Sequence, residues 1–406
     1  MDGISNWAAM SLVTSGGNSY NGSSGFKIGA DAADLIWEKA NQVNVGINAE
    51  LFNGRLALSV DGYYQKTSGL LYNISTLATT GYTTRTANIG SLENKGLEVM
   101  VSGKIFDGPF KWELATNLSY TKNKLLSLDG VLDMKINGGG ANTGKVMHAL
   151  MVGKPVSAFY MLRQDGIYQT DQEVPSKLYA KGVRAGDCKY FDYNNDGDIT
   201  DDDRMYVGKV TPDIYGGITS TMNWKNFDLS IFCQFAAGGK ILSAWKGCGG
   251  TEGTEHLGLA SSSIKGYKNG TLVNSEQFYN ISKYAANHYW RGEGTSNTVP
   301  RPTLAGTFTG GFGNNLVSTR YLEDASYFKF KTITLGYSLP HSLLSKIHVT
   351  GARIFVSLDN FFTLTKYSGY DPEFSYESNP TGNSYGADFG EQATLKSFII
   401  GASINF

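Results

Sequence analysis

Apolar and polar residues alternate along several stretches of the chain, which is the pattern of β-strands with one apolar face. The final stretch, 394–406, shows this alternation most clearly. Its apolar positions are Phe398, Ile400, Ala402, Ile404 and Phe406. Serine, glycine and asparagine fill the positions between them, and only Ile399 departs from the pattern. The segment therefore predicts a two-faced strand, which fits a membrane barrel or the core of a soluble sandwich.

A hairpin is predicted around the dipeptide Asn53-Gly54, which favours a two-residue type I′ turn. Apolar residues alternate through 43–51 before the turn and through 56–60 after it. The turn sets Phe52 opposite Arg55, and the register then follows from the alternation. It pairs Leu51 with Leu56, Ala49 with Leu58, and Ile47 with Val60. The turn and the hydrophobic pattern thus predict the same hairpin.

Four further strand pairs show the same pattern. They are 97–105 with 110–120, 145–152 with 156–167, 218–224 with 227–235, and 327–339 with 349–360. Together with the first hairpin and the last segment, they predict eleven strands. Short turns near 53, 107, 154, 225 and 343 alternate with long loops over 68–91, 125–144, 168–213, 238–325 and 361–393.

This alternation of connections places all short turns at one end of the strands and all long loops at the other. Such asymmetry is typical of an outer-membrane barrel with periplasmic turns and extracellular loops, whereas a Greek-key sandwich has no reason to sort its loops. We therefore expect an all-β, transmembrane, antiparallel up-and-down β-barrel over 41–406, with 1–40 as an extracellular loop segment. Because single-chain bacterial barrels have even strand numbers, the odd count predicts further strands before Asn41.

The composition agrees with this interpretation and excludes others. The chain has 406 residues, with 50 glycines and 24 tyrosines, and no apolar run approaches the ~20 residues of a helical membrane span. A net charge of -1 argues against a nucleic-acid partner. The three cysteines, Cys188, Cys233 and Cys248, have no CxxC spacing, so we expect free thiols rather than a disulfide framework or a zinc site.

Several stretches carry a resemblance to a known family. They are Trp37-Glu38-Lys39; Asn88-Ile89-Gly90 with Asn94-Lys95-Gly96-Leu97-Glu98; Gly186-Asp187-Cys188-Lys189-Tyr190; Arg320-Tyr321-Leu322-Glu323-Asp324-Ala325-Ser326-Tyr327; and Tyr367-Ser368-Gly369-Tyr370-Asp371-Pro372-Glu373. They occur in this order over nearly the whole chain. The chain resembles the C-terminal half of a SusC/RagA-type TonB-dependent outer-membrane transporter of Bacteroidetes.

The resemblance implies a 22-stranded barrel, of which eleven strands are half, with a plug domain and a TonB-contacting segment that this chain lacks. It also implies an outer-membrane location, no enzymatic activity, and a SusD-like lipoprotein partner at the extracellular mouth. The implied function is import of large nutrients, either oligosaccharides or peptides. The alternative is a truncated fragment that does not transport and acts at most as a surface ligand-binding or calcium-binding module.

A calcium loop is the strongest local motif. Within 192–203, oxygen-bearing side chains occupy loop positions 1, 3 and 5, glycine position 6, and a carboxylate position 12, as in an EF-hand loop. The candidate ligands are Asp192, Asn194, Asp196, Asp198, Thr200 and Asp203, with Asp198 acting through its backbone carbonyl. No helix pattern flanks the motif, so we expect a structural ion that clamps the loop 168–213. The alternative is a solvated acidic turn without metal.

Other motifs in the sequence are weaker candidates for a functional site. Gly382-Asn383-Ser384-Tyr385-Gly386 matches a GxSxG nucleophile elbow but lacks the strand and helix that an elbow requires. The five histidines, His148, His256, His288, His341 and His348, lie in separate segments without metal-ligand spacing. Aromatic residues of the loop 238–325, such as Trp245 and Trp290, could stack on sugar rings, but we expect them mainly to pack the loop.

Overall fold

The computed structural model describes thirteen stretches of the chain. They are residues 13–20, 23–28, 35–75, 84–128, 134–136, 147–248, 267–268, 271–272, 282–302, 313–344, 349–373, 384–390 and 394–405. Several residues singled out from the sequence lie outside these stretches: Gly382 and Asn383 of the GxSxG match, His256, His348 and Phe406.

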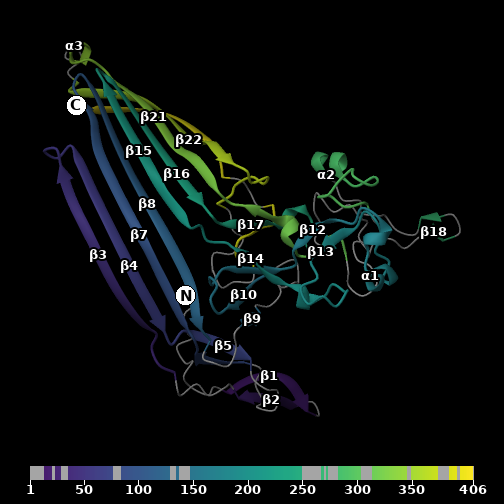
Figure 1. Cartoon of the computed structure of the whole chain (residues 1–406). Coiled ribbons are helices and arrows are strands. Elements are labelled where there is room, and N and C mark those ends of the chain that lie inside the picture. Colours follow the sequence, from purple (N-terminus) through teal and green to yellow (C-terminus); the bar gives the residue numbers. More distant parts are fainter. Residues whose placement is uncertain are drawn as a thin grey trace.

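One large antiparallel sheet dominates the described residues and slants across Figure 1. It contains nine strands in the order β24-β22-β21-β16-β15-β8-β7-β4-β3. Their bounds are β3 Lys39–Leu51, β4 Leu56–Ser68, β7 Ser91–Asp107, β8 Phe110–Ser127, β15 Ile214–Trp224, β16 Phe227–Ala237, β21 Tyr327–Ser338, β22 Gly351–Thr365 and β24 Ser397–Asn405. Each strand of the sheet pairs with its neighbour along the chain, so the up-and-down topology is confirmed.

The first hairpin forms in the predicted register. Leu51 pairs with Leu56, and the pairing continues through Ala49–Leu58 and Ile47–Val60. The turn holds Asn53 and Gly54 at φ values of 56° and 76°, the left-handed conformation that a type I′ turn requires at both central residues. The amide of Arg55 closes the turn by donating to the carbonyl of Phe52 at 3.3 Å.

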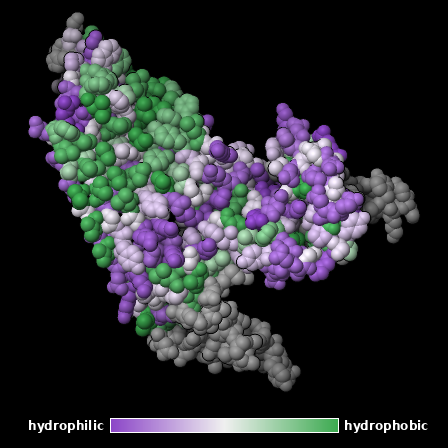
Figure 2. Space-filling view, in the orientation of Figure 1, coloured by the Kyte–Doolittle hydropathy of each residue, from purple (hydrophilic) through white to green (hydrophobic). Residues whose placement is uncertain are grey.

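The register gathers apolar side chains on one face of the sheet. One row across five strands is Val45, Gly62, Leu97, Tyr120 and Ile214. Another row is Leu229, Leu335, Val356 and Ile400. Figure 2 shows hydrophobic residues spread over the sheet, and many are exposed, including Val45 at 69% and Ile400 at 67%. Exposed apolar side chains in continuous rows require an apolar surrounding, as on the lipid-facing side of a barrel.

The predicted pair 145–152 with 156–167 is not part of this sheet, so the count of eleven wall strands is wrong for the described residues. β8 pairs directly with β15, while β11, Ala158–Met161, pairs with β14, Met205–Lys209. All four residues of β11 are buried. A run such as Ala-Phe-Tyr-Met is apolar on both faces, which suits a strand enclosed by protein rather than a wall strand with one polar face.

The remaining elements lie mostly in the long connections. The strands are β1 Val13–Tyr20, β2 Ser23–Ile28, β5 Leu71–Ser75, β6 Thr84–Asn88, β9 Met134–Ile136, β10 Ala149–Met151, β12 Gln164–Ile167, β13 Cys188–Tyr190, β17 Lys240–Ser243, β18 Tyr267–Lys268, β19 Thr271–Leu272, β20 Leu322–Asp324 and β23 Ala387–Asp388. The helices are η2 Asp171–Glu173, α1 Ser176–Ala180, η3 Asp201–Asp203, η4 Ala244–Lys246, α2 Lys283–His288, η6 Thr319–Tyr321 and α3 His341–Leu344. None of the helices in the described ranges has the length and apolar character that a membrane crossing demands.

Candidate functional site: the loop head

Three long connections of the large sheet fold together into one body, which we call the loop head. It comprises the described residues between β8 and β15, between β16 and β21, and between β22 and β24. Figure 1 shows much of this body projecting to one side of the sheet, and Figure 2 shows that its visible surface is mostly hydrophilic. The loop head lies at the long-loop end of the strands, where a barrel has its extracellular mouth.

Two buried clusters give the loop head its own core. The first joins all three connections: Met147, Phe159, Met161, Leu242, Ala244, Cys248, Val317, Tyr321 and Ala387. The second lies mainly within the connection from β8 to β15: Leu162, Tyr168, Val174, Leu178, Val183, Cys188, Tyr190 and Ile199. Because side chains from distant segments exclude water together, the three connections behave as a packed unit rather than as separate loops.

A fully buried carboxylate, that of Asp187, fastens the segments around the second cluster. Arg301 donates to it through Nε at 2.9 Å and through Nη2 at 3.0 Å. Asn314 Nδ2 donates at 3.0 Å and the amide of Arg184 at 2.9 Å. The exposed fraction of Asp187 is 0%, so its charge depends on donors such as these for compensation. Asp187 therefore joins its own segment to two others that lie more than a hundred residues further along the chain.

A second carboxylate, that of Glu323 in β20, joins the connection between β16 and β21 to the connection between β22 and β24. It accepts hydrogen bonds from Ser243 at 2.6 Å and from the hydroxyl of Ser368 at 2.8 Å, and it pairs with Lys246 at 2.9 Å. Burial raises the pKa of Glu323, but the Ser243 hydroxyl and the Lys246 ammonium outweigh burial, so the pKa lies below its ordinary value. Glu323 thus remains charged at neutral pH.

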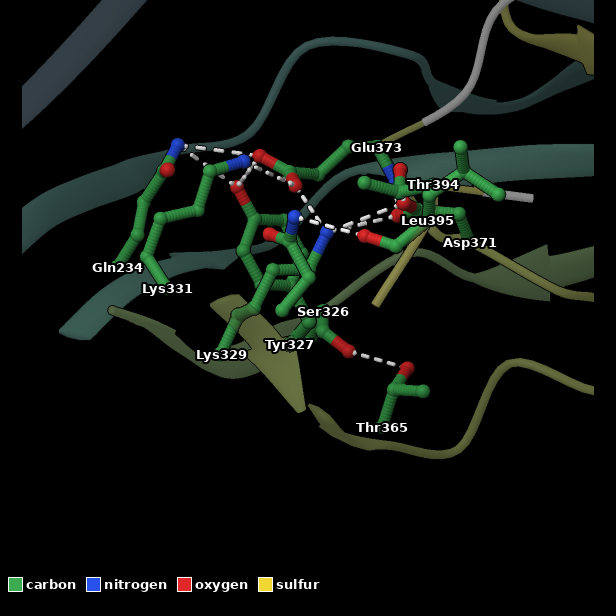
Figure 3. A network of polar contacts seen from close by, with 11 residues as sticks. Gln234, Ser326, Tyr327, Lys329, Lys331, Thr365, Asp371, Glu373, Thr394 and Leu395 are labelled. Atoms are coloured by element: carbon green, nitrogen blue, oxygen red, sulfur yellow. Dashed lines mark hydrogen bonds and ion pairs between the residues drawn. The ribbon is translucent and has the colours of Figure 1, made fainter. Parts of the chain in front are cut away.

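A polar network attaches the connection between β22 and β24 to the polar face of the sheet (Figure 3). Lys329 of β21 is 2% exposed, and its ammonium lies 3.0 Å from Asp371 Oδ1 and also contacts Glu373. Tyr327 donates to Glu373 Oε1 at 2.8 Å, and Gln234 of β16 donates to the same oxygen at 3.1 Å. The network therefore binds 371–373 to two strands of the sheet.

The Asp371 carboxyl titrates below its ordinary range. Burial raises its pKa, but the Thr394 hydroxyl, the Glu373 amide and the Lys329 ammonium favour the charged form more strongly, so the pKa lies below its ordinary value. A lowered carboxyl pKa contributes stability above the unfolded value, and this contribution is lost as the pH falls through the folded value. The Asp371 carboxylate therefore stays charged beside Lys329 at neutral pH.

The predicted calcium loop forms a compact turn. Asp192 accepts the amide of Gly197 at 2.8 Å, Asn194 accepts that of Asp196 at 3.0 Å, and Asp196 accepts that of Asp198 at 2.7 Å. Gly197 has a φ of 77°, the left-handed conformation for which glycine was expected at this position. The oxygens of loop positions 1, 3 and 5 thus each accept one of the three consecutive amides 196–198.

The other predicted ligands are engaged elsewhere. Both carboxylate oxygens of Asp198 contact Lys181, at 2.6 and 2.7 Å, and the Lys181 ammonium lowers the pKa of Asp198. Asp203 is fully buried and accepts the amides of Tyr193 and Thr200, while the Thr200 hydroxyl accepts the amide of Asp202 at 3.2 Å.

Among the predicted side-chain ligands, Asp192, Asn194 and Asp196 thus lie in one turn, whereas Thr200 and Asp203 accept backbone amides. The Asp198 carbonyl, the ligand atom predicted for that residue, is not engaged by Lys181. In the described stretches, no three or more His, Cys, Asp or Glu side chains are arranged to hold a metal ion. An EF-hand loop also binds its ion through asparagine side chains and backbone carbonyls, and a count of His, Cys, Asp and Glu side chains alone does not include these ligands. Calcium binding at this loop stays a prediction.

The remaining candidates from the sequence, Ser384 and the three cysteines, are buried. Ser384 of the GxSxG match is 1% exposed, and no helix follows it within 384–390, so it is not an exposed nucleophile. The cysteines are free. Burial raises the pKa of Cys188 to about 11 and that of Cys248 to about 12, so both thiols stay protonated and unreactive at neutral pH.

Trp245 and Trp290 pack into the loop head, as expected for residues that hold a long loop together. Trp245 Nε1 donates to the hydroxyl of Tyr367 at 3.3 Å, and Trp290 Nε1 donates to Gln169 at 3.2 Å. Tyr370 is 78% exposed, so its ring is available to a ligand or a partner at the surface.

No local pattern in the sequence predicts the roles of Lys329, Asp187 and Arg301. A signal was present for the first: Lys329 stands between Phe328 and Phe330, so a charged residue falls on the polar face between two lipid-facing aromatics. Asp187 and Asp371 both belong to the stretches that carry the family resemblance. Their chemistry was not apparent because their partners lie 114 and 42 residues away.

Comparisons with known proteins identify the family. A family model described as TonB dependent receptor-like, beta-barrel, matches residues 5–231. TonB-dependent receptor P3 of Formosa agariphila is 30% identical over 380 residues, which cover 92% of this chain and 34% of that protein. TonB-dependent receptor SusC of Bacteroides thetaiotaomicron is 26% identical over 385 residues, which cover 92% of this chain and 32% of that protein.

A solved structure of the RagAB peptide transporter matches the fold with a TM-score of 0.72 and 23% identity, covering 99% of this chain and 39% of the matched chain. The chain spans about one third of the length of the curated relatives. These relatives are receptors and transporters rather than enzymes. Since the family model covers more than half of the chain and the relatives align along most of it, this chain belongs to the TonB-dependent receptor β-barrels of the outer membrane, of the SusC and RagA type.

Proposed function

We propose that this chain forms part of the wall and the extracellular mouth of an importer for large nutrients, either oligosaccharides or peptides. The observation that carries this proposal is the loop head, in which three connections from one end of the sheet pack into one hydrophilic body. A packed body at the mouth offers a wide, shaped surface for a ligand too large for a narrow pore. Loops on a rigid scaffold are where binding surfaces commonly lie.

The same surface suits a lid. We expect a SusD-like lipoprotein to close over the loop head, and the TonB complex to act on a plug domain within a longer protein. The RagAB structures support this expectation by analogy, since one of them is described as a peptide importer in a closed-closed state and another in an open-open state. Residues such as Tyr370 and Tyr193, 78% and 57% exposed, offer the aromatic contacts that protein interfaces favour.

Import by the full-length protein is tested in cells that make it and in cells from which its gene is deleted. We expect only the first to remove peptides or oligosaccharides from a defined mixture, measured by mass spectrometry of the medium, and an uncoupler to abolish removal. Equal depletion by both strains contradicts import. Surface binding that an uncoupler leaves unchanged supports the alternative of a ligand-binding module that does not transport.

Calcium is proposed as a structural ion of the loop 192–203. Asp192→Ala or Asp196→Ala is expected to weaken calcium binding strongly, because each removes a carboxylate from the oxygen set. Asp198→Asn is expected to cost little binding, since the Asp198 carboxylate contacts Lys181 and only its carbonyl is assigned to the ion. The measurement is protease cleavage within 168–213 of the full-length protein, with calcium and with chelator.

Asp202→Ala is the control for these variants, because Asp202 is an exposed carboxylate of the same loop outside the ligand set. It should keep the calcium-dependent protection of the parent protein. Lys177 and Lys181 already lie against the loop, so a cation competes with two ammonium groups and the site should be weak. If calcium gives the parent no protection, the loop is an acidic turn closed by hydrogen bonds alone.

A further inference from the structure

A groove lies on the lipid-facing side of the sheet, where β4 lacks a side chain. Gly62 pairs with Val45 of β3 and with Leu97 of β7, so large side chains flank it on both sides. A Cβ atom built at Gly62 would meet no side chain within 4 Å. The groove has a volume of about 620 Å³, and Val43, Tyr64 and Tyr120 also line it. Its walls are apolar and exposed, with Val43 at 64% and Val45 at 69%.

Lysines occupy the end of this groove that is nearer to the long loops. Lys95 of β7 and Lys122 of β8 line it and stand directly opposite each other in the sheet. Like charges opposite each other destabilise a sheet, so this pair calls for an anion between them. Lys66 and Lys124 flank Glu93 on the same face, one strand to each side. Glu93 pairs with Lys95 at 2.8 Å, and a single carboxylate cannot neutralise four ammonium groups.

The arrangement has the two parts that an anionic lipid needs. The apolar groove around Gly62 offers contact to an acyl chain, and the lysines offer contact to a phosphate at the level of the headgroups. Tyr64 stands opposite Lys95 and Tyr120 stands opposite Leu97, so an aromatic ring accompanies each part, as is common where a barrel wall meets the membrane interface. A basic group beside an apolar groove distinguishes this site from the row of Leu229, Leu335, Val356 and Ile400, which carries only apolar side chains.

We infer that this groove is a binding site for a phosphorylated glycolipid of the outer leaflet, with an acyl chain over Gly62 and a phosphate between Lys95 and Lys122. The assignment rests on the orientation proposed above, with the long loops outside the cell. It requires no import by the protein, because the lipid is held on the outer surface of the wall.

Binding is tested on the full-length protein in nanodiscs, with fluorescent lipid A as the probe and phosphatidylglycerol and phosphatidylcholine as competitors. Replacing both lysines, Lys95→Gln with Lys122→Gln, is expected to weaken lipid A binding by about 30-fold, because each basic residue near a membrane surface contributes on the order of a few-fold to tenfold. Gly62→Val fills the groove without a backbone clash and is expected to weaken binding about tenfold, through lost acyl contact.

Two controls match these variants in chemistry but not in place. Gly103→Val adds the same side chain to the apolar face at the short-turn end, where Leu56, Arg55 and Ile105 lie no nearer than ordinary contact. Lys225→Gln removes a lysine from the short turn between β15 and β16. Both should bind lipid A as the parent does. Unchanged binding by the double lysine variant, equal losses in the controls, or displacement of lipid A by either competitor at equal concentration overturns the inference.

The outcome is independent of the import assay. If the protein binds lipid A as expected but imports nothing, the lipid site is supported and the proposed function is contradicted. If the protein imports normally but the Gly62 and lysine variants bind lipid A as the parent does, the proposed function is supported and the lipid site is contradicted.

Discussion

Lys329→Ala is expected to destabilise the attachment of the connection between β22 and β24 by about 3–5 kcal/mol, the cost of leaving a buried charge without its partner. Removing the ammonium leaves Asp371 with the Thr394 hydroxyl and the Glu373 amide, and leaves Glu373 with hydrogen bonds from Tyr327 and Gln234. Neither carboxylate then has a buried cation beside it. The measurement is the rate of protease cleavage within 366–396 of the full-length protein, together with its thermal unfolding in detergent.

Lys331→Ala is the matched control, because Lys331 reaches the same Glu373 carboxylate from the same strand. Its ammonium lies 3.8 Å from Glu373, and its side chain is 36% exposed, against 2% for Lys329. An exposed pair of this kind contributes about 0–1 kcal/mol, so cleavage should barely change. Equal sensitivity of the two variants would mean that the network does not fasten this connection, and the role assigned to Lys329 would be wrong.

Asp187→Ala is expected to loosen the loop head by about 3 kcal/mol, because it leaves buried donors without an acceptor. The Asn314 amide and the Arg184 amide lose their bonds inside the protein. Arg301 is 31% exposed and regains water in part, which keeps the cost below that of a fully buried pair. Hydrogen exchange of 168–213 and 313–321 in the full-length protein should rise in both segments together, since Asp187 joins them.

Asp165→Ala controls for the loss of an arginine–carboxylate pair. Arg163 binds Asp165 through Nε at 2.7 Å and Nη2 at 3.0 Å, the same two-bond geometry as at Asp187. Both side chains are exposed, at 41% and 35%, so water replaces the lost bonds and the expected cost is below about 1 kcal/mol. Faster exchange in only one of the two segments of Asp187→Ala would contradict a joint role.

The hairpins of the large sheet could be predicted from the sequence because the information that specifies them is local. Asn53-Gly54 sets the turn, and alternation of side chains sets which face is apolar, so the register Leu51–Leu56 follows without knowledge of any other strand. The same reasoning predicted the turn at Lys225-Asn226 and the apolar face from Phe110 to Tyr120. The sorting of short and long connections then indicated a membrane barrel, and the family confirms it.

The loop head could not be predicted in this way, because its determinants lie far apart in the sequence. Asp187 binds Arg301, which lies 114 residues away in the sequence. Lys329 binds Asp371, which lies beyond β22 in a connection whose path no local pattern specifies. The same limit explains the error at 145–167: a run of apolar residues reads as a strand, but only the tertiary structure decides that Phe159 and Met161 are enclosed on both faces. Alternation is a property of neighbouring residues, so the sequence by itself determined the strands of the large sheet. The burial of a charge, or of a strand that is apolar on both faces, depends on distant segments that pack against it. Only the tertiary structure therefore decided how the loop head is built.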